Sequence, residues 1–195
     1  MKKMKNLKKC LVVVMMLGTL INYANDKKNT TYVVEGKKVK VEFNAVKKGN
    51  KLTIRDSYDV IIFSQEIENS GNYSKIFNLS NLLKGDYTAE LEKDFEIVIK
   101  NFSVLEGKVS FNGEKRVFKP VIRTEKNKVL ISKIDFNKEP LKVALYFNGE
   151  VIYSETVKDN SNVLNRVYKL SKEERGNYTV VINTNDRNYV QNFNF

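Results

Sequence analysis

Three pairs of acidic residues have the types and spacing that acid–base catalysis requires. They are Asp56 with Asp59, Asp94 with Glu96, and Glu173 with Glu174. Serine–histidine, cysteine–histidine and histidine–metal sites are excluded, because the sequence contains no histidine and its one cysteine, Cys10, lies in the N-terminal segment. Each acidic pair falls in a loop or at a strand end, where acidic residues are common. We therefore expect a protein that is not an enzyme and predict no catalytic residue.

An oxygen-rich stretch near the C-terminus is the second candidate for chemistry. It runs Asn183-x-Asn185-Asp186-x-Asn188, and the corresponding stretch of an earlier repeat holds Glu92, Asp94 and Glu96. Calcium prefers six or more oxygen ligands with several carboxylates among them. One aspartate among three asparagines favours a plain hairpin turn, and phosphate-binding glycine loops are missing from the sequence. We predict no metal site and no cofactor.

Aromatic residues are the third candidate, because exposed rings can stack on sugars. The residues concerned are Tyr146, Phe147, Tyr153, Tyr168, Tyr178 and Tyr189. Most of them occupy alternating positions of expected strands, which favours packing in a hydrophobic core over a sugar-binding platform.

The elements that carry these residues are organised by an internal repeat. A segment from Phe77 to Val104 recurs 91 positions later, from Tyr168 to Phe195, without a gap. Such self-similarity is typical of a duplicated supersecondary unit. Eight residues mark the two copies: Leu79, Ser80, Gly85 and Tyr87 in the first, and Leu170, Ser171, Gly176 and Tyr178 in the second.

The repeated unit has the pattern of a strand, a polar loop and a second strand. After the loop, Tyr87, Ala89 and Leu91 alternate with polar residues, as in a half-buried strand. We expect Gly85 and Gly176 to close the loop with a positive φ angle. The glycine and tyrosine resemble the tyrosine corner of immunoglobulin-like sandwiches, which implies that the phenol holds the loop.

The whole pattern predicts an all-β protein with two tandem immunoglobulin-like β-sandwich domains. We place the first at residues 32–104 and the second at residues 105–195. Asn112-Gly113 and Asn148-Gly149, each between alternating runs, predict type I′ hairpin turns. We also align Asn127-Lys128 with Asn50-Lys51, which leaves residues 134–145 as an extra strand or hairpin of the second copy.

The N-terminal segment has the layout of an export signal. Five lysines precede an apolar stretch from Leu11 to Ile21, and Ala24 offers a cleavage point. The alternative is an uncleaved membrane anchor. The apolar stretch is too short for this, because a spanning helix needs roughly 20 apolar residues. We predict a signal peptide at residues 1–24, a flexible lead-in at residues 25–31, and no stable membrane span after processing.

The charge balance weakens once this segment is set aside. Removal of the segment takes away five lysines and lowers the formal net charge from +11 to about +6. The remaining lysines and arginines are spread along strands and loops and form no single stripe, so we predict no nucleic-acid partner. An exported chain with this composition is expected in the periplasm, at the outer surface or outside the cell, with an unknown protein or glycan as its partner.

The second copy resembles a further family. Its order is Val143–Phe147, then Asn148-Gly149, then Leu170-Ser171 followed by Gly176 and Tyr178. This order is similar to the C-terminal sorting domain of Por-type (type IX) secretion cargo. The resemblance covers about 70 residues and implies a small β-sandwich that carries its protein across the outer membrane.

Two functions therefore stay open at this point. The first is a non-catalytic exported protein with a structural, adhesive or partner-binding role at the cell envelope or surface, acting through sheet edges or loops. The second is a secretion-associated protein whose C-terminal domain acts as a sorting signal.

Overall fold

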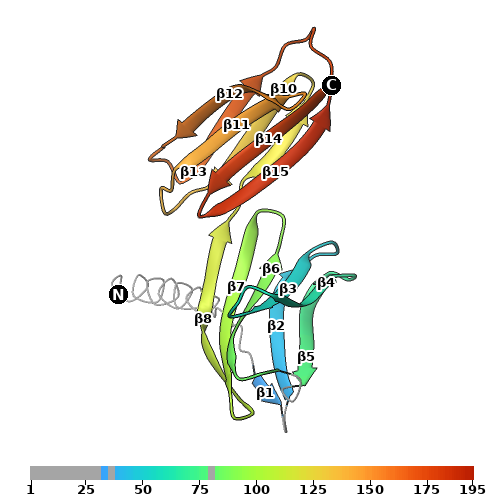
Figure 1. Cartoon of the computed structure of the whole chain (residues 1–195), viewed down its shortest axis with the longest axis vertical. Coiled ribbons are helices and arrows are strands. Elements are labelled where there is room, and N and C mark those ends of the chain that lie inside the picture. Colours follow the sequence, from blue (N-terminus) through green and yellow to red (C-terminus); the bar gives the residue numbers. More distant parts are fainter. Residues whose placement is uncertain (1–31, 35–37, 79–81) are drawn as a thin grey trace, which may run out of the picture.

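The computed structural model describes residues 32–34, 38–78 and 82–195. The predicted signal peptide and lead-in, residues 1–31, lie outside the described residues. Two β-sandwich domains are stacked end to end along the long axis of the molecule (Figure 1). The described chain is built of β-strands joined by turns and loops, which confirms the predicted all-β, immunoglobulin-like class.

The first domain consists of a three-stranded and a five-stranded antiparallel sheet. The first sheet has the order β1-β2-β5 and the second the order β4-β3-β6-β7-β8. The strands are β1 (Tyr32–Val34), β2 (Lys38–Val46), β3 (Lys51–Asp56), β4 (Ile61–Glu66), β5 (Gly71–Asn78), β6 (Gly85–Glu92), β7 (Glu96–Leu105) and β8 (Lys108–Phe118).

The second domain repeats this arrangement with one strand fewer. Its sheets have the orders β13-β10-β9 and β12-β11-β14-β15, which correspond to β5-β2-β1 and β4-β3-β6-β7 of the first domain. The strands are β9 (Val121–Glu125), β10 (Lys128–Ile134), β11 (Leu141–Phe147), β12 (Glu150–Val157), β13 (Val163–Lys169), β14 (Asn177–Thr184) and β15 (Arg187–Asn194). Among the described strands of the second domain, none corresponds to β8.

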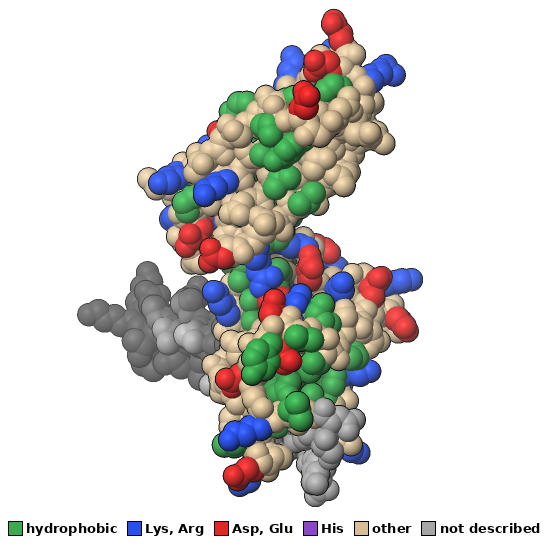
Figure 2. Space-filling view, viewed as in Figure 1, with side chains coloured by type: hydrophobic (Ala, Val, Ile, Leu, Met, Phe, Trp, Pro, Cys, Tyr) green, Lys and Arg blue, Asp and Glu red, His purple; other side chains and the backbone are tan. Residues whose placement is uncertain are grey.

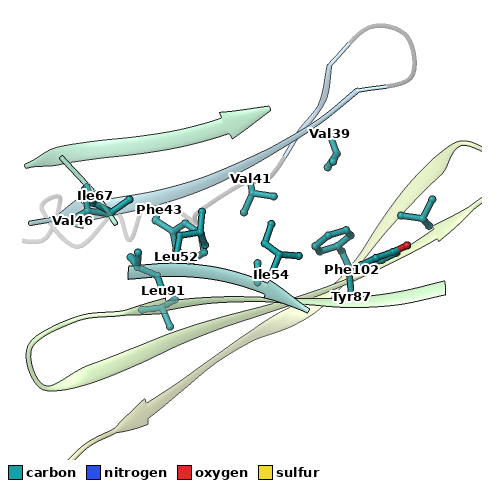
Figure 3. Close-up of a cluster of buried hydrophobic side chains, with 13 residues drawn as sticks. Val39, Val41, Phe43, Val46, Leu52, Ile54, Ile67, Tyr87, Leu91 and Phe102 are labelled. Atoms are coloured by element: carbon teal, nitrogen blue, oxygen red, sulfur yellow. The ribbon is translucent and has the colours of Figure 1, made fainter. Parts of the chain in front are cut away.

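Alternation of apolar and polar residues explains why each sheet has one buried face. Along β2, Val39, Val41 and Phe43 are buried between the sheets, because successive side chains of a strand point to opposite faces. They meet Leu52 and Ile54 from β3 across the sandwich (Figure 3). The first domain therefore has a core of its own.

A separate core fills the second domain. Val129 and Ile131 of β10 face Val143 of β11 and Val180 and Ile182 of β14, and all five are buried. Two separate cores, each enclosed by its own pair of sheets, make the two units domains in the structural sense.

The boundary between the domains lies later than the sequence indicates. The expected boundary at residues 104 and 105 falls in the β-hairpin that joins β7 to β8, and β8 pairs with β7 along its whole length. Strand β8 therefore belongs to the first sandwich, and the chain passes to β9 through Lys119-Pro120. The prediction erred because the repeat that set the boundary ends at Val104, before β8 begins.

The two predicted Asn-Gly hairpins have different outcomes. Asn148 and Gly149 connect β11 to β12 with φ angles of 48° and 89°, as a type I′ turn requires. Asn112-Gly113 is no hairpin: it lies within β8, where the pairing shifts from Asn101↔Gly113 to Phe102↔Phe111. This shift is a β-bulge, and Gly113 takes a φ of 123° there.

The alignment of Asn127-Lys128 with Asn50-Lys51 is also wrong. Asn50 precedes β3, the second strand of the core, whereas Asn127 precedes β10, which corresponds to β2. The residues counted as an insertion, 134–145, hold the end of β10, a loop and the start of β11. The second copy therefore has no extra strand at this place.

Candidate functional site

The repeated tyrosines hold the loops before the central strands. The phenol of Tyr87 donates a hydrogen bond of 2.7 Å to the carbonyl of Leu83, and that of Tyr178 donates one of 2.8 Å to the carbonyl of Glu174. Both bonds span four residues, and burial raises the pKa of both phenols. The geometry is that of a tyrosine corner in each domain.

The Leu-Ser pair of the repeat can be described in the second domain, where both residues form hydrogen bonds within the fold. Leu79 and Ser80 lie outside the described residues. Leu170 is buried and donates its N–H to the carbonyl of Asn127, 2.8 Å away, and the hydroxyl of Ser171 accepts the N–H of Glu173. These contacts hold the loop of the second domain in place.

Gly176 is required for a reason that differs from the predicted one. Its φ angle is not positive, while that of Gly85 is 159°, close to extended backbone. A Cβ on Gly176 would lie 2.8 Å from Cε2 of Phe147 and 2.9 Å from Oδ1 of Asn148. The glycine is therefore needed for the close approach of this loop to the β11–β12 hairpin.

The acidic residues of the first two pairs are held by turns and ion pairs. Asp56 accepts the N–H groups of Tyr58 and Val60 and so closes a turn. Asp59 forms an ion pair with Arg55 in the same turn. The second pair is divided between different cations: Asp94 binds Lys47 at 2.8 Å, which holds its pKa below the usual value, whereas Glu96 faces Lys93 and Arg116.

The oxygen-rich stretch near the C-terminus forms a tight hairpin. Asn185 and Asp186 have φ angles of 52° and 56° and connect β14 to β15. The side chain of Asn183 donates to that of Asn188 at 2.6 Å across the two strands. Within the described ranges, no group of three or more acidic, cysteine or histidine side chains is placed to hold a metal.

The aromatic residues divide between core and edge. Phe147 packs 4.8 Å from Tyr178 of the second-domain core, and Tyr178 stacks on Phe193. Tyr153 of β12 and Tyr168 of β13 pack 5.6 Å apart, between edge strands of the two sheets. Tyr153 is the more exposed of the two, and its ring continues an apolar strip on β12.

This strip, which we call the bulged edge, is present in both domains. In β4, Ile54 pairs with Phe63 and Arg55 with Ile61, so that Ile62 is the extra residue of a β-bulge. In β12, Leu145 pairs with Tyr153 and Tyr146 with Val151, so that Ile152 is the extra residue. The bulged edge comprises Ile61, Ile62 and Phe63 in the first domain and Val151, Ile152 and Tyr153 in the second.

The bulged edge exposes apolar side chains at the same place of each domain. Ile62 and Ile152 have 41% and 46% of their surface exposed. Behind them, Phe63 packs edge-to-face on Phe77 of β5, and Tyr153 packs on Tyr168 of β13 with the two rings tilted by 54°. The sequence holds a visible indication of this edge, since Ile-Ile-Phe-Ser at residues 61–64 recurs as Val-Ile-Tyr-Ser at residues 151–154.

A cleft of about 770 Å³ lies between the domains and is lined by charged residues. Arg187 of β15 donates two hydrogen bonds, of 2.5 and 3.4 Å, to Glu90 of β6 across it. The Lys133–Asp135 ion pair, 2.7 Å long and buried, lines its second-domain side. Phe118 and Phe136 pack edge-to-face 5.5 Å apart beside it. The Arg187–Glu90 and Phe118–Phe136 contacts connect the two domains.

Charge is mixed over the surface. Lysine and arginine side chains alternate with acidic ones over the visible face of both domains, with apolar side chains between them (Figure 2). A stripe of one sign, as nucleic-acid binding needs, is not seen on this face. No helix within the described part of the chain has the length and apolar character to cross a membrane.

Comparison with known proteins adds a structural neighbour. No family model matches the chain, and no curated protein matches it in sequence. Among solved structures, the chain is similar to the human OSCAR ligand-binding domain with 8% sequence identity and a TM-score of 0.24. That match covers 81% of this chain and 89% of the neighbour.

Proposed function

We propose that this is an exported, non-catalytic two-domain β-sandwich protein that binds a protein or glycan partner at the cell envelope or surface. The observation that carries the proposal is the bulged edge, which presents similar apolar residues at the same place of both domains. Exposed apolar patches on a folded protein are typical of interaction sites.

The bulge decides which kind of contact this edge makes. A β-bulge interrupts the regular ladder of backbone groups, so that addition of a further strand is disfavoured. The partner therefore binds the side chains of Ile62 and Ile152 and the neighbouring rings. Two copies of the edge on one chain allow both domains to bind a repeated partner, which strengthens binding through effective concentration.

The acidic residues support a role without catalysis. Asp56 is engaged in a turn, and Asp94 and Glu96 bind different cations on the first domain. General acid–base chemistry needs a side chain positioned to transfer a proton to or from the reacting group. The geometry around these residues serves turns and ion pairs instead.

The proposal is tested by capture of partners from the cell envelope with wild-type and variant protein. Ile62→Glu and Ile152→Glu together place charge on the bulged edge and are expected to abolish capture. Val163→Glu, at a valine of β13 that is 50% exposed, is the matched control and is expected to retain it. Failure of the wild-type protein to capture any protein or glycan would count against the proposal.

The alternative is a sorting role for the second domain, as in type IX secretion cargo. It is favoured by the separate core of that domain and by its single short connection, Lys119-Pro120. Under this alternative the second domain is removed after transport. Cleavage is then expected at the connection, since a cut near Val104 would detach β8 from the first sandwich.

A further inference from the structure

Strand β15 is an edge strand without the usual protection. It lies at the end of the four-stranded sheet β12-β11-β14-β15. After Arg187, its residues Asn188–Asn194 include no charged residue and no proline, and the pairing with β14 shows no bulge. Natural proteins block such edges because exposed backbone groups pair with other strands.

The other edge strands are blocked in recognisable ways. Strands β4, β8 and β12 each contain a bulge, and β1 has three residues. Strands β5, β9 and β13 carry Lys75, Arg123 and Arg166 within them. Among the strands that the structure describes, β15 therefore differs from the rest of the sheet edges.

The first domain shows what occupies the equivalent position. Strand β7 corresponds to β15, and β8 covers it in antiparallel pairing. On the outer face of β7, Ile97 and Ile99 are buried together with Val117 of β8. Val190 corresponds to Ile99 in the repeat, yet it is 60% exposed, compared with 9% for Ile99. No strand among the described residues pairs with the outer side of β15.

The backbone groups available on this edge can be assigned. Gly176 and Phe195 exchange both of their backbone hydrogen bonds, 3.2 and 3.3 Å long. Because bonded pairs alternate along an antiparallel ladder, the odd residues of β15 bond to β14. The N–H and C=O groups of Asn188, Val190, Asn192 and Asn194 therefore point away from the sheet.

We propose that β15 pairs with β15 of a second copy of this chain, antiparallel about a two-fold axis at Gln191. This register places Val190 opposite Asn192 of the second copy and Tyr189 opposite Phe193, and it brings no charge against a like charge. It also lies within the uncharged segment, away from Arg187, which is held by Glu90. An isologous contact of this kind closes with two chains.

There is space beside the strand for this partner. A surface cleft of about 410 Å³ runs along Asn188–Gln191, and Val121, Ile122 and the hairpin around Asp94 form its other side. The end of the second β15 lies there in the proposed register. The inference goes beyond the proposed function, which uses the side chains of the bulged edge, whereas this pairing uses the backbone groups of β15.

A proline substitution tests the edge without disturbing the domain. Val190→Pro removes an outward N–H and no bond to β14, and proline is tolerated on edge strands. Sedimentation of the purified chain is expected to show a wild-type dimer whose dissociation constant rises about tenfold or more in the variant.

Val167→Pro is the matched control for this substitution. Val167 lies on edge strand β13 and is 59% exposed. Leu170 and Asn162 form backbone hydrogen bonds on the β10 side of β13. Because bonded residues alternate along a strand, the even-numbered residues of β13 bond to β10, and the N–H of Val167 points outward. Val167→Pro is expected to leave the dimer unchanged. Equal weakening by both prolines would overturn the inference.

A disulfide tests the register. In a Cys10→Ser background, Gln191→Cys places two cysteines on the axis as a non-hydrogen-bonded pair with Cα atoms about 4.5 Å apart, within bridging range. Oxidation is expected to give a covalent dimer. Asn188→Cys, whose two copies would lie about 20 Å apart, is expected to stay monomeric under the same conditions.

The outcomes separate this inference from the proposed function. A wild-type chain that is monomeric, or a Gln191→Cys chain that does not cross-link, overturns the β15 pairing. If that chain still captures an envelope partner through Ile62 and Ile152, the proposed function stands. If the dimer forms but no partner is captured, the pairing stands and the proposed function fails.

Discussion

At the scale of single residues, the two domains share the hydrogen bonds that hold their loops. Besides the tyrosine corners, the hydroxyl of Thr88 donates to Asn101 at 3.1 Å and that of Thr179 donates to Asn192 at 2.8 Å. Each pair joins the same two positions of the repeat. The repeated residues thus make the same hydrogen bonds, within the loop and between the two neighbouring strands, in both domains.

Removal of one corner hydrogen bond should weaken the first domain measurably. Tyr87→Phe keeps the ring and its stacking on Phe102 but leaves the Leu83 carbonyl without its donor. A loss of about 1 kcal/mol in the free energy of unfolding is expected from urea titration. Tyr58→Phe, at a tyrosine that is exposed, is the control and should change stability by less than about 0.5 kcal/mol.

Tyr168 should make stability depend on alkaline pH. Burial first, and then the hydrogen bond of 2.6 Å to Glu155, raise the pKa of this phenol above its usual value of 10.0. The stabilisation is complete below pH 10, where the unfolded phenol is also protonated, and it is lost as the pH rises through the folded-state pKa.

The test compares unfolding free energies between pH 9 and pH 11. The wild-type protein is expected to lose stability over this range more steeply than Tyr168→Phe, while Tyr58→Phe should follow the wild type. Identical slopes for wild type and Tyr168→Phe would show that the Tyr168 phenol does not take part in this transition.

At the scale of strands, the sequence predicts what is local and repeated. Apolar and polar residues alternate along Lys38–Phe43 and along Tyr87–Leu91. This alternation suffices to predict two strands, because side-chain burial at period two is a local property. The hairpin at Asn148-Gly149 follows from two residues that tolerate positive φ. The residues of the bulged edge recur in the sequence, but the bulge itself is visible only from the pairing of the strands.

What the sequence does not reveal depends on partners distant along the chain. Asn112-Gly113 has the composition of a hairpin, but β7 continues beyond it and converts the pair into a bulge. The glycine at position 176 predicts a turn with positive φ, but a glycine is needed there because Phe147 and Asn148 leave no space for a Cβ. The unpaired state of β15 becomes visible only when the two domains are compared strand by strand.

The bulge in β8 gives a prediction at this scale. Gly113→Ala places a Cβ on a residue with φ of 123°, a region that is essentially restricted to glycine, and should cost about 1–3 kcal/mol of unfolding free energy. Lys115→Ala on the same strand serves as the control. Thermal or urea unfolding that is unchanged by Gly113→Ala would contradict the assignment of this bulge.

At the scale of the whole molecule, the two domains are joined by Lys119-Pro120 and by the contacts across their cleft. The Arg187–Glu90 ion pair is the main polar contact, with Phe118 packed on Phe136 beside it. An arrangement of this kind fixes the spacing between the two bulged edges. A partner that binds both edges therefore depends on the relative orientation of the domains.

The ion pair between the domains can be tested by a double-mutant cycle. Glu90→Gln and Arg187→Gln are expected to be coupled by about 1 kcal/mol, since the pair is partly exposed to solvent. Small-angle scattering should show a broader distribution of domain orientations in either variant. Asp94→Asn, which breaks an ion pair within the first domain, should leave the scattering unchanged.

The intact mass and cellular fraction of the native protein test the account most directly. The proposed function predicts a chain that begins near Asn25, extends through Phe195 and is retained with the cell envelope or surface. A chain found in the cytoplasm with residues 1–24 still attached would contradict it. A secreted chain that ends near Lys119-Pro120 would instead support the sorting role and leave the first sandwich as the functional domain.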